Sequence, residues 1–546
     1  MNKGILCLTF AISCVFSVWA DTYPKNPNVD ILNYAFKIEL SDETDEIKCE
    51  ATIDVRFVGH GINTLRLDLV KASATLDDKG MTVSQVLSEG KPLSFTHENG
   101  ELKISLPATA KINQTSQYTI TYAGIPATGL RIAKNKYGDR TFFSDNWPDK
   151  GRNWLPMVDH PYDKATCEFI VTAPSHYQVV SNGLKVEETD LPNDKRLTHW
   201  KQSVPIAPWL YVLGVARFAV QYVDQFDNKS IETWVYHQDR EAGFYDFAEP
   251  TKKVLEFYSD FVGPFSYEKL ANIQSNSVSG GMEAASAILY SESSVVGDRN
   301  ERWRNVVIHE IAHQWFGNAV TEYDWDDVWL SEGFATYFTL LFIEHEYGHE
   351  AFMNGLASSK EKVNTYYTQH PDYRIVHDNL SDMSKVTSLQ TYQKGSWILH
   401  MLRGVVGEAS FWKGIQSYYK KYRNLNAITS DFRREMEEAS GIELADFFQQ
   451  WLYKPGTLVI EGIWHYNAKE KEVVMQLRQT QKGDNIFKMP IEVAIHTSKG
   501  GTLLTKIIQI EEKQNEFKFA MDAEPEKILI DPNNWVLMDA KISKKK

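Results

Sequence analysis

Residues 309–313 have the sequence HEIAH, which places two histidines and a glutamate at the spacing of a metal site. On a helix, His309 and His313 are four residues apart, so both imidazoles project from one face toward one ion. Glu310 lies beside that face, where its carboxylate can take a proton from an attacking water. Glu332 follows in a second predicted helix and would supply an oxygen ligand. Two histidines and a glutamate leave a fourth position open, which is the pattern of a catalytic zinc.

Two helices must position these side chains. The apolar spacing predicts a helix over residues 305–316 that ends at Gly317. Ser331 has the side chain of an N-cap and predicts the start of a second helix, which runs to Tyr347 and ends at Gly348. The alternative is a core helix with two buried histidines and no metal, because HExxH also occurs by chance.

Length and composition limit the class of protein. A chain of 546 residues is too long for one ordinary domain and predicts two to four. Its hydrophobic content of 43% supports large cores and argues against disorder. The formal net charge of −14 argues against nucleic acid or an anionic membrane as partner.

The first 20 residues have the features of a secretory signal peptide. Lys3 supplies the positive end, residues 4–16 the apolar region, and Val18-Trp19-Ala20 a small-residue cleavage site. Acylation of Cys14 as a lipoprotein is an alternative, which the Val-Phe after it disfavours. No later stretch reaches the roughly 20 apolar residues that span a bilayer. We therefore expect a soluble exported protein, periplasmic or extracellular.

After removal of this segment, Cys49 and Cys167 are the remaining cysteines. They can pair in an oxidising compartment or stay as buried free thiols. Two cysteines exclude a cysteine-based zinc site as the main metal centre.

The chain divides into three parts that differ in predicted secondary structure. Residues 21–222 contain short strands broken by turns and predict an all-β domain. Residues 223–455 are mainly helical, and residues 456–546 return to strands at about ten-residue spacing, typical of a β-sandwich.

Residues 142–169, dense in Trp, Pro and Asp, predict either an inter-domain contact or a substrate wall. Residues 270–295 predict an edge strand, a glycine-rich turn and another strand. Further helices are predicted at 250–263, 389–407, 408–424 and 430–441.

Several segments resemble the zinc aminopeptidases of the aminopeptidase N and leukotriene-epoxide hydrolase family, the gluzincin aminopeptidases. The segments are HEIAHQWFGNAVT (309–321), WLSEGFATY (329–337), SGGMEA (279–284), TYQKG (391–395) and WLPMVDHPYDKAT (154–166). The resemblance implies a multidomain fold with an N-terminal all-β domain, a thermolysin-like α+β catalytic domain and a C-terminal β-sandwich. The large C-terminal helical domain of many relatives is expected to be absent.

The resemblance also implies roles for the site residues. His309, His313 and Glu332 would bind one zinc ion per chain, with Glu310 as general base. Tyr392 would stabilise the tetrahedral oxyanion, because a phenol aimed at developing charge favours the transition state over the ground state.

Substrate contacts are implied for the glycine-rich segment. Glu283 would hold the free α-ammonium and so fix the cut one residue from the N-terminus. Gly280 and Gly281 would let the backbone approach the peptide closely, beside Met282. Ala284 replaces the family's usual Asn, which concerns specificity rather than chemistry. Ser331 likewise replaces the Asn usual before the third metal ligand.

Two further acidic positions near these segments have open roles. Asp145 with Asn146 is a candidate to face the amino end of the substrate. Asp327 is either a partner of a metal-binding histidine or an ordinary helix-turn acid.

The sequence therefore predicts a zinc aminopeptidase that releases neutral N-terminal residues from peptides with a free N-terminus. Three alternatives remain: a zinc endopeptidase, an epoxide hydrolase on the same centre, and a non-catalytic peptide-binding scaffold. The metal could be another divalent ion, although two histidines and a glutamate favour zinc. A homo-oligomer is left open.

Overall fold

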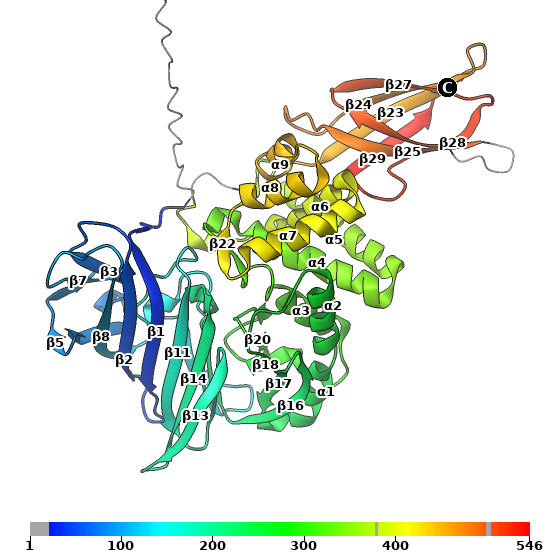
Figure 1. Ribbon diagram of the computed structural model, residues 1–546. Coiled ribbons are helices and arrows are strands. Elements are labelled where there is room, and N and C mark those ends of the chain that lie inside the picture. Colours follow the sequence, from blue (N-terminus) through cyan, green and yellow to red (C-terminus); the bar gives the residue numbers. More distant parts are fainter. Residues whose placement is uncertain (1–20, 377–379, 498–503, 546) are drawn as a thin grey trace, which may run out of the picture.

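The computed structural model describes residues 21–376, 380–497 and 504–545. The predicted signal peptide lies outside the described residues. The chain forms an N-terminal β-region, a central region of sheet and helices, and a C-terminal β-region (Figure 1). The site lies in the central region, so the flanking parts matter here for how they hold it.

The N-terminal region is all β, as predicted. An eight-stranded sheet in the order β13-β14-β11-β1-β2-β8-β4-β5 forms its main layer. Buried and half-buried residues alternate along β11, so that one face of the sheet packs on the core. Its strands are β1 (Val29–Glu39), β2 (Ile47–Phe57), β4 (Gly80–Ser88), β5 (Lys91–Pro92), β8 (Gln114–Ile125), β11 (Ala165–Pro174), β13 (Leu184–Leu191) and β14 (Lys195–Ile206).

Two smaller sheets complete this region. One has the order β12-β15-β10-β9 and the other the order β3-β7-β6. Their strands are β3 (Thr64–Asp68), β6 (Phe95–Glu98), β7 (Glu101–Ser105), β9 (Leu130–Lys134), β10 (Arg140–Ser144), β12 (Gln178–Ser181) and β15 (Leu213–Ala216).

A five-stranded sheet begins the central region, in the order β16-β17-β18-β20-β19. Strand β18 lies in the middle, so the prediction of an edge strand there was wrong. It pairs in parallel with strands on both sides and all seven of its residues are buried. The edge is β19, the glycine segment itself, which is therefore free on one side. The strands are β16 (Phe218–Phe226), β17 (Lys229–Tyr236), β18 (Lys269–Ser275), β19 (Gly281–Met282) and β20 (Ala287–Ser291).

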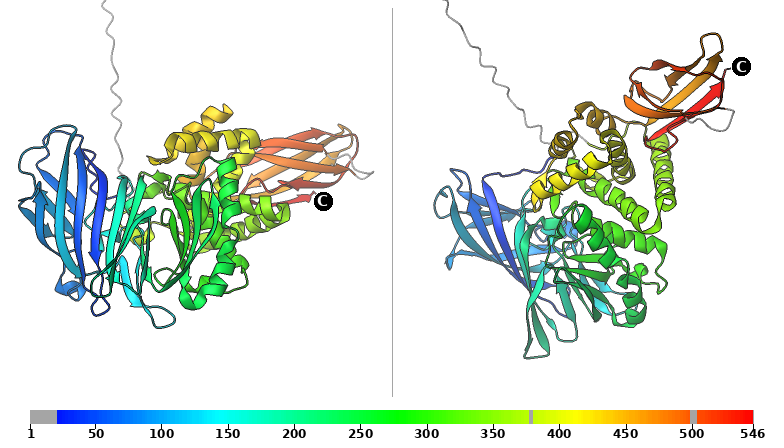
Figure 2. Two further views of the ribbon diagram at one scale, coloured as in Figure 1. Left: turned by 60° about the horizontal axis from the view of Figure 1, so that its bottom comes forward. Right: turned by 45° about the vertical axis from the view of Figure 1, so that its right-hand side comes forward.

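Two helices lie between β17 and β18 in the sequence, and the other helices follow β20 (Figures 1 and 2). Two short strands, β21 (Val320–Glu322) and β22 (Leu425–Ala427), pair in parallel among them. The helices are α1 (Arg240–Ala248), α2 (Thr251–Phe261), α3 (Glu301–Ala312), α4 (Trp329–Tyr347), α5 (His349–Gln369), α6 (Leu389–Val406), α7 (Glu408–Tyr422), α8 (Thr429–Ser440) and α9 (Ala445–Leu452). Helix α5 was not predicted.

The ends of two helices differ from the prediction. Helix α3 begins at Glu301 because the Asn300 side chain accepts a hydrogen bond from the Arg302 N–H, and it ends at Ala312 rather than at residue 316. Helix α4 begins at Trp329, so Ser331 lies inside the first turn and is not the N-cap. Gly348 ends α4 as predicted, with a φ of 91°.

The C-terminal region is the predicted sandwich, with sheets in the orders β27-β24-β23-β29 and β26-β25-β28. It packs on α6, where Trp535 stacks on His400 with ring centroids 4.8 Å apart. Among the described residues, no helix follows α9. The strands are β23 (Leu458–Asn467), β24 (Glu472–Gln479), β25 (Met489–Thr497), β26 (Leu504–Ile510), β27 (Gln514–Ala520), β28 (Pro525–Ile530) and β29 (Met538–Lys544).

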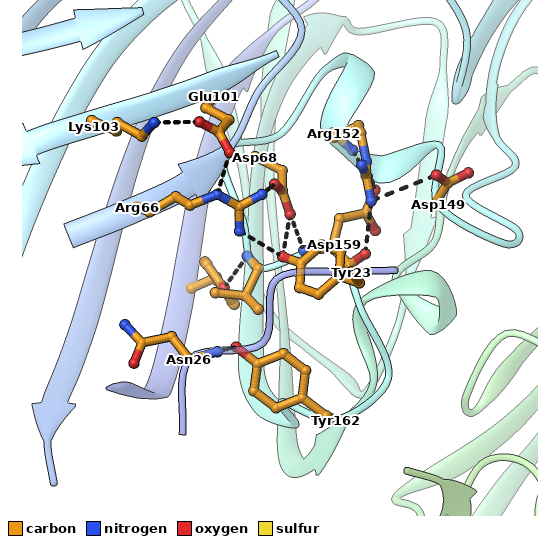
Figure 3. Close-up of polar contacts among 12 residues, drawn as sticks. Tyr23, Asn26, Arg66, Asp68, Glu101, Lys103, Asp149, Arg152, Asp159 and Tyr162 are labelled. Carbon is orange, nitrogen blue, oxygen red and sulfur yellow. Dashed lines mark hydrogen bonds and ion pairs between the residues drawn. The ribbon is translucent and has the colours of Figure 1, made fainter. Parts of the chain in front are cut away.

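The first described residues, 21–28, form an N-terminal strap that joins the β-region to the central region. Figure 3 shows the Tyr23 side chain among polar groups of the β-region, where its hydroxyl donates to Asp68. The Tyr23 ring stacks on His160 at 4.6 Å. Lys25 then pairs with Asp324 of the central region at 2.8 Å. A buried ion pair therefore links the two regions.

The Trp-rich segment provides a second link. The Trp147 ring lies 4.8 Å from that of Trp209 and 4.9 Å from that of Trp325, which belongs to the central region. Of the two interpretations of residues 142–169, these contacts support the inter-domain contact.

Two further sequence predictions concern the cysteines and membrane-spanning helices. Cys49 and Cys167 are both buried free thiols. None of the helices within the described ranges has both the length and the apolar character needed to cross a bilayer.

Candidate active site

The predicted metal ligands meet at one point. The Nε2 atoms of His309 and His313 lie 3.1 Å apart, and the Glu332 Oε2 atom lies 3.5 Å and 3.2 Å from them. Helix α3 carries His309 and its C-cap residue is His313, while Glu332 comes from the first turn of α4. These three residues form the metal-binding cluster found within the described ranges.

This triangle fits a tetrahedral ion. Two ligand atoms at about 2.1 Å from a tetrahedral centre lie about 3.4 Å apart, close to the three separations here. Glu332 Oε2 is buried and has no hydrogen-bond donor among the described residues. A buried carboxylate oxygen without a donor needs a cation, which a metal in this position supplies. The three side chains could therefore bind one zinc ion.

The outer nitrogen of His313 is also fixed. Its Nδ1 atom lies 3.1 Å from the Phe316 carbonyl oxygen and 3.0 Å from Ser331 Oγ. A carbonyl only accepts, so Nδ1–H donates to it and Nε2 keeps its lone pair for the metal. Ser331, wrongly predicted as a helix cap, thus acts as a neighbour of a metal ligand.

Glu310 packs against the glycine segment. It is buried, on α3, beside the two histidines. A Cβ added at Gly281 would lie closer than 3.0 Å to the Glu310 carboxylate, whereas one at Gly280 would meet no atom within 4 Å. Residue 281 is therefore glycine because the proposed base occupies the space of a side chain.

Glu283 directly follows β19 and is held by its backbone. Its carbonyl oxygen accepts hydrogen bonds from the side chains of Gln314, at 3.0 Å, and Asn318, at 2.6 Å. Its own Oε1 atom is buried without a hydrogen-bond partner among the described residues. Such a carboxylate, set beside the metal ligands, suits a cationic group of a substrate. Neither Gln314 nor Asn318 was predicted, although both are polar residues in the HQWFGN segment.

Tyr392 reaches the same centre from α6. Its hydroxyl donates to Glu332 Oε1 at 2.9 Å. Helices α4 and α6 approach closely because Gly333 faces Gly395, where a Cβ on either residue would lie within 3.0 Å of the other backbone. The glycine of the TYQKG segment therefore brings the tyrosine to the metal ligands.

The charges of the site shift the pKa values of its members. Burial, and then the charge of Glu283, raises the pKa of Glu310 well above its usual range. Burial raises the pKa of Glu283 to about 7. Burial alone would raise the pKa of Glu332, but the charge of His313 and the proximity of both imidazoles lower it to about 2. A metal dication would lower the pKa of the neighbouring carboxyls as well.

The three remaining candidate residues, Asp145, Asn146 and Asp327, make different contacts. Asp145 pairs with Lys150 at 2.7 Å, and its charge contributes to the raised pKa of Glu283. Asn146 is structural, because its amide donates to the Tyr211 carbonyl. Asp327 accepts from the Thr429 hydroxyl at 2.5 Å and holds the start of α8 rather than a histidine.

Comparison with known proteins places this geometry in a family. The model of the peptidase family M1 domain matches residues 247–451, which include all the site residues above except Asp145 and Asn146. The model of the peptidase M1 N-terminal domain matches residues 31–210. The chain belongs to peptidase family M1.

Relatives of this M1 peptidase are similar over much of the chain. A probable aminopeptidase 2 from Sulfurisphaera tokodaii is 27% identical over 454 residues, 79% of this chain and 56% of that one. A glutamyl aminopeptidase from Sus scrofa is 29% identical over 352 residues, 61% of this chain and 36% of that one. The chain thus spans about half, or about a third, of the length of these curated relatives.

A solved structure shares the fold. The M1 zinc metallopeptidase from Deinococcus radiodurans superposes with a TM-score of 0.67 at 23% identity, covering 78% of this chain and 93% of that one. The expected multidomain fold is confirmed.

Proposed function

We propose that this M1 peptidase is a zinc-dependent aminopeptidase that removes one N-terminal residue at a time from peptides. The observation that carries the proposal is the placement of Glu283. Its buried, unpartnered carboxylate oxygen lies beside the His309, His313 and Glu332 cluster. A carboxylate at a fixed place beside the cut binds a free α-ammonium and so sets the distance from the N-terminus to the scissile bond.

A bound zinc ion would polarise the scissile carbonyl and lower the pKa of the attacking water to about 7. Glu310 takes the proton from that water and passes it to the leaving nitrogen. Its carboxylate lies against the Gly281 backbone of the edge strand β19. Tyr392, already turned toward the Glu332 carboxylate, donates its hydroxyl proton to the oxyanion as charge develops there.

We further propose export to the periplasm or the extracellular space, on the signal-peptide features of residues 1–20. The substrates follow from the site: peptides with a free N-terminus and a neutral first residue. The names of the relatives, probable aminopeptidase 2 and glutamyl aminopeptidase, support the reaction class.

The test combines metal removal with one substitution. The purified chain should cleave aminoacyl 4-nitroanilides, lose activity with a chelator and regain it with zinc. Glu310→Gln should retain about one zinc per chain and lose activity by at least about 100-fold, the contribution of a general base. Glu256→Gln, an exposed position on α2, is the matched control and should keep full activity. Full turnover by Glu310→Gln would contradict the proposed mechanism.

A further inference from the structure

A cavity of about 800 Å³ opens beside the metal ligands. His309 and Tyr392 form its inner end, and helices α3, α4 and α5 form its walls. Along α5 the lining residues recur at helical spacing, from Ala351 through Gly355 and Ser359 to Lys362. The unpredicted helix α5 thus builds one whole wall.

The cavity lies on the side of the metal ligands opposite Glu283. Its α3 lining comes from the N-terminal part of the helix, up to His309. Glu283 is held from the other end, by Gln314 and Asn318 beyond the helix C-terminus. Glu283 is not among the lining residues. A peptide with its α-ammonium at Glu283 and its scissile carbonyl at the metal ligands therefore extends its leaving part into this cavity, here called the leaving-side pocket.

Cations dominate the charge of the leaving-side pocket. Its lining contains Arg302, Arg304 and Lys362 against a single carboxylate, that of Glu301. This is a local reversal of sign in a chain of net charge −14. Clefts lined by one sign of charge concentrate ligands of the opposite sign.

These cations remain available to a ligand. Lys362 makes no ion pair with any residue in the described parts of the chain. Arg304 lies over the Tyr347 ring at 4.1 Å, which orients its guanidinium. Its one ion pair within the described parts of the chain, with Glu301, is 3.5 Å long, and the Glu301 side chain is 79% exposed. An exposed pair of this kind contributes little and is easily exchanged.

We propose that the leaving-side pocket selects peptides carrying a carboxylate on the leaving side of the cut, bound by Arg304 and Lys362. The inference rests on the proposed function, because a leaving side exists only for a cut beside a bound N-terminus. The carboxylate can be the C-terminus of a tripeptide or the side chain of an acidic second residue.

The dimensions agree with this assignment. Two extended residues span about 7 Å. Arg304 lies five residues before His309, or about 7.5 Å along the helix axis. The guanidinium also presents a planar fork that matches a carboxylate. A tripeptide therefore places its C-terminal carboxylate in the range of these side chains.

Matched peptides separate the two sources of the carboxylate. Ala-Gly-Gly and its C-terminal amide differ only in the terminal charge. Ala-Glu-Gly-amide and Ala-Gln-Gly-amide differ only in the side-chain charge. We expect kcat/KM about tenfold higher for the charged member of at least one pair, the effect of one charge-assisted hydrogen bond, and a smaller preference at high salt. The pair that shows the preference identifies the source.

Variants locate the effect in the holoenzyme. Arg304→Gln and Lys362→Gln should each reduce severalfold the ratio of kcat/KM between the charged and the uncharged member of the pair, mainly by lowering kcat/KM for the charged peptide. Lys420→Gln on α7 removes the same charge from an exposed position outside the pocket and should keep the preference. Preferences below about twofold in both pairs, or a preference that survives both pocket variants, would overturn the inference. No cleavage of alanine 4-nitroanilide or of other aminoacyl 4-nitroanilides would instead contradict the proposed function.

Discussion

At the scale of single residues, the spacing of side chains was the most reliable guide. His309, His313 and Glu332 meet as the helical spacing predicts, because two positions four apart on a helix share a face whatever surrounds them. Helical spacing alone does not predict contacts between segments that lie far apart in the sequence. Ser331 has the residue type of a cap, yet its hydroxyl contacts His313, eighteen residues earlier. Only the packing of α3 on α4 decides this.

The contact of Gly281 with Glu310 gives a sharp prediction. Gly281→Ala places a methyl group where the Glu310 carboxylate lies and should displace it, lowering kcat by about 100-fold while zinc content stays unchanged. Gly280→Ala meets no protein atom within 4 Å and should have a much smaller effect. Steady-state kinetics with metal analysis decides; equal losses from both variants would indicate that both glycines serve the peptide instead.

Ser331 should tune metal binding without taking part in catalysis. Ser331→Ala removes the hydroxyl beside His313 Nδ1 and leaves the Phe316 carbonyl as acceptor. We expect about a tenfold loss of zinc affinity, the usual size of such outer contacts, in chelator competition. Ser331→Asn, with an amide in the same place, should recover part of it. An unchanged affinity in Ser331→Ala would show that the Phe316 carbonyl alone orients the ring.

At the scale of elements, helix α5 shows why the prediction was incomplete. Its buried positions are Phe352, Leu356, Ser359 and Val363, a regular helical stripe. Because one of the four is a serine and Gly355 lowers the helix propensity of the segment, the helical pattern is too weak to recognise. Helix α6, which was predicted, begins at a Ser388 cap and buries Trp397, Ile398, Leu399, Met401 and Leu402.

The N-terminal strap joins the β-region to the central region, so its loss should lower the stability of the whole chain. Lys25 forms ion pairs with both Asp21 and Asp324, each at 2.8 Å. Lys25→Met leaves these carboxylates buried without that cation and should lower the free energy of unfolding by about 3–5 kcal/mol.

Urea denaturation measures this loss. Lys37→Met, which breaks the exposed pair with Glu50, is the matched control and should cost less than about 1 kcal/mol. A Lys25→Met chain as stable as the control would mean that the strap does not link the two regions.

At the scale of the whole molecule, the order of domains followed from texture alone. The sequence predicts short strands, then amphipathic helices, then strands again, and so predicts the three regions. Strands and helices bury different patterns of apolar residues, which makes them distinguishable. How the regions join was not predictable. The strap and the Trp147 contacts bring together residues from opposite parts of the sequence.

The buried acids make global stability depend on pH. Asp163 is buried, with Oδ1 accepting from the Ile31 N–H and Oδ2 without a partner among the described residues. Burial raises its pKa to about 8. In the unfolded chain this carboxyl ionises near pH 4. The folded state thus holds the extra proton, and its stabilising contribution, full below about pH 4, is lost as the pH rises toward 8.

Asp163→Asn removes this titration and keeps an acceptor for the Ile31 N–H. Relative to wild type, the variant should gain more than about 1 kcal/mol of stability between pH 5 and pH 8. Denaturant unfolding at both values tests it. Asp522→Asn, at an exposed acid of the C-terminal region, is the control and should show no such gain. Parallel curves for Asp163→Asn and wild type would place the Asp163 carboxyl in contact with water or a cation.

The central claim is that Glu283 binds the free α-ammonium of the substrate and so places the scissile bond one residue from the N-terminus. Its most direct test compares one peptide with its N-acetylated form, with the products identified by mass spectrometry. The account predicts that the free peptide loses residues one at a time from its N-terminus and that the acetylated peptide stays intact. Cleavage of both forms at the same rate would contradict it and indicate an endopeptidase on the same metal centre.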